Sequence, residues 1–426
     1  MVKEEISVFW FRRDLRLADN CALFHALNSK YRVLPLFIFD EAILNELPKD
    51  DARISFIYET LKNLNDELKN INSSLYIKKG NSEKIWDTVF EEFKVKNVFF
   101  NKDYEPYAKY RDEKIKSICK QKNINCISFK DQVIFEEAEI VKADGLPYSV
   151  YTPYKNKWLE KYKLMNLNEY KSENYLDNFF KLSFTFPSLE SIGFIESDDK
   201  VLPFNFKCIK KYQDIRDFPT QETSNASVYL RFGTISVRKL VDYASNTNEI
   251  YLSELIWREF FMQILFHYPK VVNENFKSKY NFIPWRNNEK EFKKWCEGKT
   301  GYAIVDAGMR QLNKTGYMHN RVRMITASFL CKHLLIDWRW GEAYFAEKLL
   351  DFELSSNNGN WQWVAGTGCD SAPYFRVFNP ETQQQRFDPN FEYIKKWNPN
   401  YKEIPEVVEH KFARLRYLDT LKESLL

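Results

Sequence analysis

Carboxamides, a glycine and two indoles are concentrated in residues 355–363, which read Ser-Ser-Asn-Asn-Gly-Asn-Trp-Gln-Trp. The carboxylates of Asp351 and Glu353 stand just upstream. The stretch matches neither a metal cage nor a phosphate loop. Neutral hydrogen-bonding groups beside indoles suit a bound planar heterocycle whose electrons, rather than protons, take part in the reaction. The alternative is a packed helix corner with capping asparagines.

Two further segments bring charged side chains next to apolar ones. Residues 317–324 supply the cations Arg321 and Arg323 at i and i+2. Glu254, Trp257 and Phe261 share one helical face at i, i+3 and i+7. Burying an unpaired glutamate costs free energy, so a cleft-lining face explains this stripe better than plain core, although the glutamate could also sit at the edge of the stripe.

Aromatic and basic residues are skewed toward the C-terminal half. Of the 11 tryptophans, 8 lie beyond residue 250, and residues 201–426 carry a net charge of +6 against −2 for the rest. Indole faces stack on rings or bases, and basic charge suits a phosphate backbone. This skew favours a nucleic-acid-binding face there, with a large aromatic core as the alternative.

Cysteine usage and hydropathy indicate the compartment. The seven cysteines are scattered without a Cys-x-x-Cys pair, which fits neither a disulfide framework nor a structural metal site. The N-terminal residues lack the apolar core of a signal peptide, and no apolar run reaches the length of a membrane span. We therefore expect a cytoplasmic protein without a membrane partner.

The first ~130 residues alternate β-rich runs with amphipathic helical patterns, which indicates βαβ units and a parallel sheet. The expected strands are residues 6–11, 33–39, 74–77, 95–100 and 125–129. The dinucleotide fingerprint Gly-x-Gly-x-x-Gly is absent. Residues 12–16, Arg-Arg-Asp-Leu-Arg, follow the first strand and could meet a ligand at the carboxyl edge of the sheet. A solvated charge run is the alternative.

Residues 131–205 lose this rhythm and contain several prolines, which marks a long connector, and helical periodicity dominates beyond residue 205. Thr223 and Ser224 lie just before a helical stretch, where free backbone N–H groups can hold a phosphate. Ordinary N-capping is the alternative.

Taken together and in this order, these segments resemble the photolyase/cryptochrome family, most closely its class I cyclobutane pyrimidine dimer photolyases. The matching motifs are residues 9–16, 254–260, 318–324, 357–363 and 370–380. The resemblance implies an α/β plus all-α fold. A Rossmann-like antenna domain would span residues 1–130, an interdomain linker 131–205 and a helical FAD-binding domain 206–426.

The resemblance also assigns cofactor contacts. Arg323 would be the charge partner of Asp351, and Asn357 would face N5 of the flavin. A neutral carboxamide there tolerates the anionic, fully reduced flavin that repair needs. The FAD ligands implied are Tyr212, Thr223, Ser224, Ser227, Arg323, Asp351, Glu353 and Asn357.

The resemblance implies a light-driven redox cycle on UV-damaged DNA. Glu254 and Met324 would line the cavity for a flipped dimer, with Glu254 stabilising the developing negative charge. Trp361, Trp338 and Trp285 would relay electrons to oxidised flavin. The residues implied to contact DNA are Arg216, Trp257, Asn320, Arg321 and Trp363, of which Trp257 and Trp363 flank the dimer.

Two alternatives within the family are a six-four photoproduct photolyase, whose members tend to carry His-His where this chain has His319-Asn320, and a cryptochrome-type blue-light photoreceptor. A non-catalytic FAD or nucleic-acid-binding module is a third. Ala108 stands where folate-binding relatives carry a glutamate, which leaves the identity or presence of a second antenna chromophore open. We expect a monomer.

Overall fold

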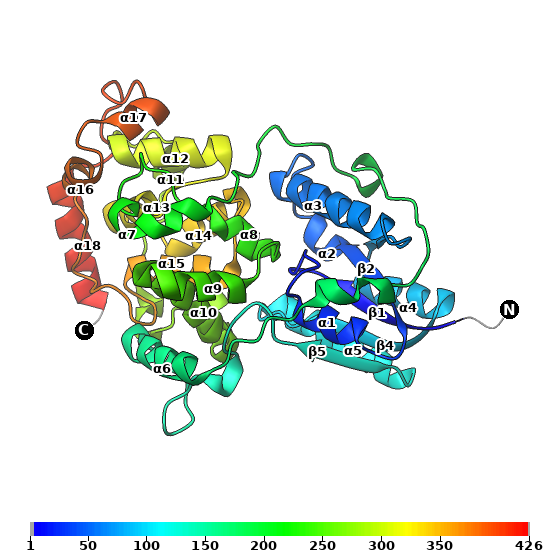
Figure 1. Ribbon diagram of the computed structural model, residues 1–426. Helices are drawn as coiled ribbons and strands as arrows, with labels where there is room; N and C mark the ends of the chain where they lie inside the picture. The colour runs from blue at the N-terminus through cyan, green and yellow to red at the C-terminus, as the bar shows by residue number, and fades with distance from the viewer. Residues whose placement is uncertain (1–3, 425–426) are drawn as a thin grey trace. The chain divides into compact units, whose positions relative to one another are not determined.

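The computed structural model describes residues 4–424, and the chain folds as two compact units (Figure 1). The first unit is built from the chain up to Glu136 together with Tyr162–Pro203 and Ala226–Ser245. The second is built from Glu137–Lys161, Phe204–Asn225 and the chain from Asn246 onward. The boundaries between antenna domain, linker and FAD-binding domain at residues 130 and 205 remain predictions.

A five-stranded, fully parallel sheet forms the centre of the first unit, in the order β3-β2-β1-β4-β5. Val8 of β1 aligns with Leu34 of β2 on one side and with Val98 of β4 on the other. The sheet confirms the expected α/β fold. Its strands are β1 (Glu5–Phe11), β2 (Arg32–Asp40), β3 (Tyr76–Gly80), β4 (Lys94–Asn101) and β5 (Asn125–Phe129).

Helices cover the sheet because its strands are apolar on both faces. Val8 and Trp10 of β1 pack in one cluster with Trp86 of α4 and Ile115 of α5, and Phe9 and the other alternate residues point to the opposite face. The helices of this unit are α1 (Cys21–Leu27), α2 (Glu41–Leu44), α3 (Ala52–Lys69), α4 (Ser82–Glu92), α5 (Pro106–Gln121), α8 (Ala226–Phe232) and α9 (Val237–Thr247).

The charge run after β1 is bound within the fold rather than solvated. The Arg12 guanidinium pairs with Asp112, donates to the Asn101 carbonyl and lies over the ring of Trp10 at 4.9 Å. Arg16 is buried and pairs with Asp131 at 2.7 Å. Both side chains therefore organise the carboxyl edge of the sheet, and the alternative of a solvated run is wrong for them.

The second unit is helical, as expected, and its core is rich in indoles. Trp295, Trp338 and Trp361 belong to one buried cluster with residues from the helices around them. The helices are α6 (Tyr151–Leu164), α7 (Tyr212–Ile215), α10 (Glu249–His267), α11 (Glu289–Cys296), α12 (Ala303–Thr315), α13 (Asn320–Ser328), α14 (Trp338–Lys348), α15 (Leu354–Ala365), α16 (Pro380–Phe387), α17 (Glu392–Trp397) and α18 (His410–Ser424).

Local sequence explains where the helices that carry candidate residues begin and end. The Asn248 side chain caps α10 by accepting from the backbone N–H of Tyr251, and Asp337 caps α14 in the same way. Helix α15 ends at Gly366, whose φ of 88° requires the left-handed conformation that glycine adopts freely. Between Glu4 and Ser424, no helix combines the length and apolar character needed to cross a membrane.

Candidate functional site

Helix α15 carries the carboxamide-rich stretch, and its first residues hold a buried carboxylate. Glu353 is the N-cap residue, and its carboxylate accepts hydrogen bonds from Ser355 Oγ (2.9 Å) and Ser356 Oγ (2.6 Å). These contacts orient Glu353 along the start of the helix, where the positive end of the helix dipole stabilises a negative charge.

Asp351 forms an ion pair with Arg323 through only one of its two carboxylate oxygens. Arg323 Nη2 donates to Asp351 Oδ2 at 2.9 Å, and Arg323 Nε donates to the Met318 carbonyl at 2.7 Å. Asp351 Oδ1 is buried, yet it accepts no hydrogen bond from any residue that the structure describes. A buried unsatisfied oxygen costs about 1–3 kcal/mol, so this atom is suited to accept from a ligand N–H or O–H group.

The carboxamide of Asn357 is oriented by Glu342. Asn357 Nδ2 donates to the Glu342 backbone carbonyl at 3.1 Å and to Glu342 Oε1 at 2.8 Å. Burial raises the pKa of Glu342, which the hydrogen bond from Asn357 partly offsets. Because both N–H groups of the amide are directed to Glu342, the carbonyl oxygen is the group that Asn357 offers to a ligand.

The three predicted electron-relay residues lie in the same apolar region. Trp361 and Trp338 are fully buried, and Trp285 is half-buried against the same cluster. Trp338 Nε1 donates to Asn275 Oδ1 at 2.8 Å. Trp295 stands edge-on to Trp361 with ring centroids 6.2 Å apart, and no pattern around it in the sequence distinguished it from ordinary core.

Glu254 and Arg216 pair with one another. Their side chains approach to 2.8 Å and are 33% and 27% exposed, so the pair borders solvent. Burial raises the pKa of Glu254, and Arg216 opposes that shift. Arg216 also lies over the ring of Tyr212 at 5.3 Å. The structure thus joins a predicted lesion contact, a predicted DNA contact and a predicted cofactor contact in one cluster.

This cluster extends to the predicted phosphate loop. Tyr212 stands edge-on to Tyr251 at 5.0 Å, and the Tyr251 hydroxyl lies 2.9 Å from Ser224 Oγ. Thr223 is half-buried beside the buried Ser224. Ser227 is exposed in α8, a helix of the first unit. Ser224 is therefore linked to Arg216 through Tyr251 and Tyr212.

One face of Trp257 is covered by Tyr151, a residue that sequence reasoning missed. The two rings are parallel to within 9°, with centroids 3.6 Å apart. The Tyr151 hydroxyl donates to the Ser253 carbonyl at 2.7 Å, and its backbone N–H donates to Asp370 Oδ2 at 3.0 Å. Tyr151 thereby holds the Trp257 indole in place through contact with one of its faces. In the sequence it begins the stretch that forms α6 and carries no distinguishing pattern.

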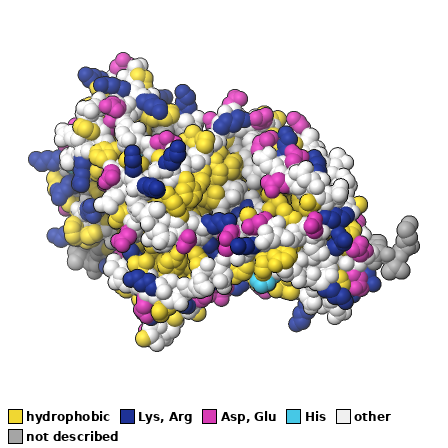
Figure 2. Space-filling model, viewed as in Figure 1, with side chains coloured by type: hydrophobic (Ala, Val, Ile, Leu, Met, Phe, Trp, Pro, Cys, Tyr) yellow, Lys and Arg dark blue, Asp and Glu magenta, His cyan; other side chains and the backbone are white. Residues whose placement is uncertain are grey.

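The remaining predicted DNA contacts lie on α13 and α15. Arg321 pairs with Asp217, lies over Phe387 at 4.4 Å and reaches Met324 Sδ at 3.8 Å. Asn320 is exposed at the start of α13, and Trp363 is half-buried on α15. Figure 2 shows exposed hydrophobic side chains with Lys and Arg side chains among them on the visible face of the helical unit.

His319 caps α13 as a neutral imidazole. Its Nδ1 accepts the backbone N–H of Arg321 at 3.2 Å. Burial and the cations of Arg323 and Arg321 lower the pKa of His319 to about 4. At neutral pH the ring is therefore uncharged.

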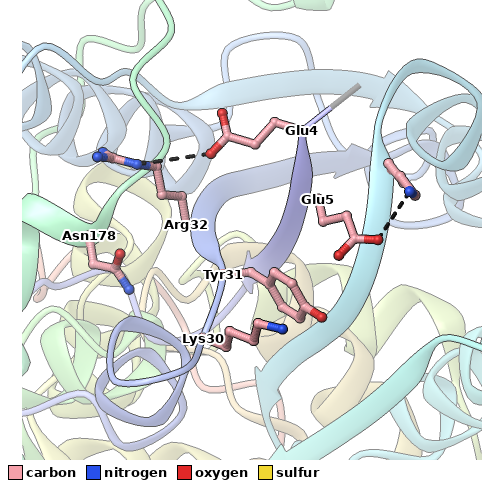
Figure 3. Close-up of a pocket in the computed structure, with 7 residues that line it drawn as sticks. Glu4, Glu5, Lys30, Tyr31, Arg32 and Asn178 are labelled. Carbon is pink, nitrogen blue, oxygen red and sulfur yellow. Dashed lines mark ion pairs between the residues drawn. The ribbon is translucent and has the colours of Figure 1, made fainter. Parts of the chain in front are cut away.

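A hollow at the amino ends of the strands in the first unit does not share this chemistry (Figure 3). Its charges of opposite sign pair with each other: Glu4 lies 4.0 Å from Arg32, and Glu5 lies 3.0 Å from Lys94. Ligands of open parallel sheets bind at the carboxyl ends of the strands, so this hollow is at the wrong edge.

Comparisons with known proteins identify the family of the chain. Residues 7–172 match the family described as DNA photolyase, and residues 251–422 match the FAD binding domain of DNA photolyase. The chain is 34% identical to the deoxyribodipyrimidine photo-lyase of Halobacterium salinarum, over 96% of this chain and 92% of that protein. The chain belongs to the DNA photolyase family.

Solved structures share the whole architecture. An archaeal photolyase from Sulfolobus tokodaii, described with two FAD molecules, has a TM-score of 0.84 at 33% identity and covers 98% of this chain and 100% of its own. A Synechocystis cryptochrome has a TM-score of 0.84 at 23% identity and covers 99% and 100%. At that identity the second likeness shows the fold alone.

Proposed function

We propose that this protein repairs DNA in light by splitting cyclobutane pyrimidine dimers with bound, fully reduced FAD. The observation that carries the proposal is the buried, unpartnered Oδ1 of Asp351 within the region that matches the FAD binding domain. The name of the H. salinarum relative, a deoxyribodipyrimidine photo-lyase, supports the substrate class.

The residues present suit FAD. Asp351 would use its unpartnered oxygen to accept from the cofactor, while Arg323 holds the other oxygen. Glu353, Tyr212, Thr223, Ser224 and Ser227 are the further proposed contacts. Bound FAD would supply one electron to the lesion after photoexcitation and take it back once the ring has opened.

Asn357 would meet the cofactor through its carbonyl oxygen. Because Glu342 holds the amide N–H groups, the carbonyl can accept a hydrogen bond from an N–H group of a reduced heterocycle. A carboxamide neither gains nor loses a proton at neutral pH. Asn357 would therefore orient the flavin without opening a proton-transfer route.

Glu254 would bind the lesion at the border with solvent. Burial raises the pKa of Glu254, against the opposing charge of Arg216. The Glu254 carboxyl would hydrogen-bond to the edge of a pyrimidine and stabilise the negative charge that develops there. Arg216 is held against Glu254 without DNA and would turn to a phosphate when the strand binds. Met324 would line the same cavity.

Trp257 offers the lesion a preformed stacking surface. Tyr151 covers one face of the indole, and a flipped base would stack on the part of the half-buried ring that stays exposed. Base–aromatic stacking contributes about 1–3 kcal/mol per base, which offsets much of the cost of flipping a damaged pair. Trp363 would flank the lesion, and Asn320 and Arg321 would hold the strand.

Trp361, Trp338 and Trp285 would carry electrons inward to oxidised FAD. Their shared, largely buried cluster keeps the indoles dry and rigid, which suits electron transfer. A second antenna chromophore is also proposed, on the ground that the S. tokodaii structure is described with two FAD molecules that imply a novel light-harvesting cofactor. A monomer remains the expected state.

A cryptochrome-type photoreceptor is the second candidate because the Synechocystis cryptochrome shares the fold. A six-four photolyase is the third. The three functions differ in substrate. Repair removes a defined lesion, whereas a photoreceptor changes its partners in light.

The test is a lesion assay with the photoreduced holoprotein and two oligonucleotides, one carrying a thymine dimer and one a six-four lesion, under blue light and in the dark. Light-dependent loss of the dimer supports the proposal. Glu254→Gln should lower the repair yield, and Glu347→Gln, on the exposed face of α14, is the matched control. Loss of six-four lesions alone would reassign the substrate, and loss of neither lesion would favour the photoreceptor.

A further inference from the structure

Two consecutive residues at the end of α7 form ion pairs with two different helices. Arg216, the C-cap residue of α7, pairs with Glu254 of α10 at 2.8 Å. The next residue, Asp217, pairs with Arg321 in the first turn of α13. One short segment therefore holds a proposed lesion contact and a proposed strand contact. Asp217 has no part in the contacts proposed above.

Arg321 depends on Asp217 for its neutralising charge. Within residues 4–424, Asp217 is the only acid that pairs with Arg321, and the buried Nε of Arg321 donates to no residue. The guanidinium lies over the ring of Phe387 at 4.4 Å. Arg321 also stands in the first turn of a helix, where the positive end of the helix dipole disfavours a cation. An anion beside Arg321 is therefore strongly favoured, and in the protein without DNA that anion is Asp217.

A DNA phosphate would make the same kind of contact with Arg321 as the Asp217 carboxylate. Both anions present oxygens that accept hydrogen bonds from the fork of a guanidinium group. The Asp217 side chain is 36% exposed, so a strand at the surface can reach the ion pair. The strand gains the phosphate contact only when Arg321 leaves Asp217, so the two anions compete for one cation.

The neighbouring ion pair couples this competition to the lesion. A dimer that binds Glu254 takes the place of Arg216, whose backbone N–H closes α7 on the Tyr212 carbonyl at 2.9 Å. Because Arg216 and Asp217 are consecutive, a turn of Arg216 away from Glu254 also moves the Asp217 carboxylate. Undamaged DNA places no base against Glu254, which leaves both ion pairs closed.

We propose that Asp217 is a positioning residue for lesion recognition, which holds Arg321 away from undamaged DNA and releases it when a dimer engages Glu254. This inference rests on the proposed function, because it requires Arg321 to meet a DNA phosphate. Its consequence is specificity, since DNA with a dimer gains the Arg321 contact and undamaged DNA does not.

The experiment measures binding of the FAD-bound protein to two fluorescent duplexes in the dark, one undamaged and one with a thymine dimer, over a range of salt concentrations. Each phosphate contact on duplex DNA contributes about 0.9 to the slope of log K against log salt. Asp217→Asn frees Arg321, so the slope for the undamaged duplex should steepen by about 0.9 and its affinity should rise severalfold. The duplex with the dimer should change little, and the preference for it should fall.

Three further variants separate this role from a general effect of charge. Glu347→Gln is the matched control, because it also removes one negative charge and frees a basic side chain, Lys348. It should leave both slopes unchanged. Asp217→Glu keeps the charge and should keep the wild-type preference. In the background of Arg321→Gln, Asp217→Asn should have no further effect, because Asp217 acts through Arg321.

The same titrations distinguish failure of this inference from failure of the proposed function. The role of Asp217 is overturned if Asp217→Asn leaves the slope for the undamaged duplex unchanged, or if its effect persists without Arg321. A wild-type protein that binds the two duplexes alike would instead count against repair of pyrimidine dimers.

Discussion

Two buried aspartates of the α/β unit and Asp351 of the helical unit differ in how completely their carboxylates are paired. In the α/β unit, Asp19 and Asp131 are buried, and each of their four oxygens accepts at least one hydrogen bond. Arg238 bonds to both residues, and Arg16 completes the network. In the helical unit, Asp351 has one oxygen paired with Arg323, and its other, buried oxygen has no partner among residues 4–424.

The difference separates structural charge from charge prepared for a ligand. A network in which every carboxylate oxygen already accepts a hydrogen bond cannot accept one from a ligand, so it stabilises the fold. A carboxylate with a buried oxygen that accepts no hydrogen bond is destabilised by its desolvation, and a hydrogen-bond donor on a ligand can offset that cost. The mutational predictions below follow from this contrast.

The largest expected effect is on stability. Asp131→Ala leaves Arg16 and Arg238 buried with one partner fewer, and breaking a buried pair in this way costs about 3–5 kcal/mol. Urea titration followed by circular dichroism should show this loss in the free energy of unfolding. Asp351→Ala in the FAD-free protein should cost clearly less. If Asp131→Ala and Asp351→Ala lost the same free energy of unfolding, the proposed difference between the two carboxylates would be wrong.

The second effect is on cofactor affinity. Asp351→Asn weakens an accepted charge-assisted hydrogen bond, for which we expect a loss of about 1.5–3 kcal/mol, or roughly 10–100-fold in the Kd for FAD. Fluorescence titration of the FAD-free protein measures it. Glu347→Gln, an exposed carboxylate on α14, is the matched control. Unchanged affinity in Asp351→Asn would show that its free oxygen does not meet FAD.

The third effect concerns the stacked pair. Trp257→Ala should weaken binding of dimer-containing DNA by about 1–3 kcal/mol, because a base loses its stacking partner. Tyr151→Phe keeps the ring against the indole and loses only the bond to Ser253, so a loss near 1 kcal/mol or less is expected. Binding anisotropy with damaged and undamaged oligonucleotides separates the two. Equal weakening for both DNAs would assign Trp257 to backbone contact.

The smallest effect is on pH dependence. Burial would raise the pKa of Asp131, but Arg16 and Arg238 prevail and lower it. A carboxyl with a lowered folded-state pKa stabilises the protein above its unfolded pKa of about 3.9, and this stability is lost as the pH falls through the folded value. The wild-type free energy of unfolding should therefore decline more steeply than that of Asp131→Asn below about pH 4. If the free energy of unfolding of the two proteins declined in parallel with pH, Asp131 would not be stabilised by Arg16 and Arg238.

The fold was largely predictable because its signals are local. Apolar runs near residues 6–11 and 95–100 coincide with β1 and β4, since strand burial depends on a short, contiguous pattern. The long motifs around Glu254 and Asn357 identified the family and so the helical unit. Tyr151 could not be found in this way, because its role comes from contact with a ring more than a hundred residues away.

By itself, the sequence determined the parallel sheet, the helical second half and the residue types that suit a flavin, because periodicity and motif order are properties of neighbouring residues. Only the tertiary structure decided which partners each side chain has. It leaves one oxygen of Asp351 open while it closes both oxygens of Asp131. Pairing depends on distances in space, and a linear pattern does not encode them.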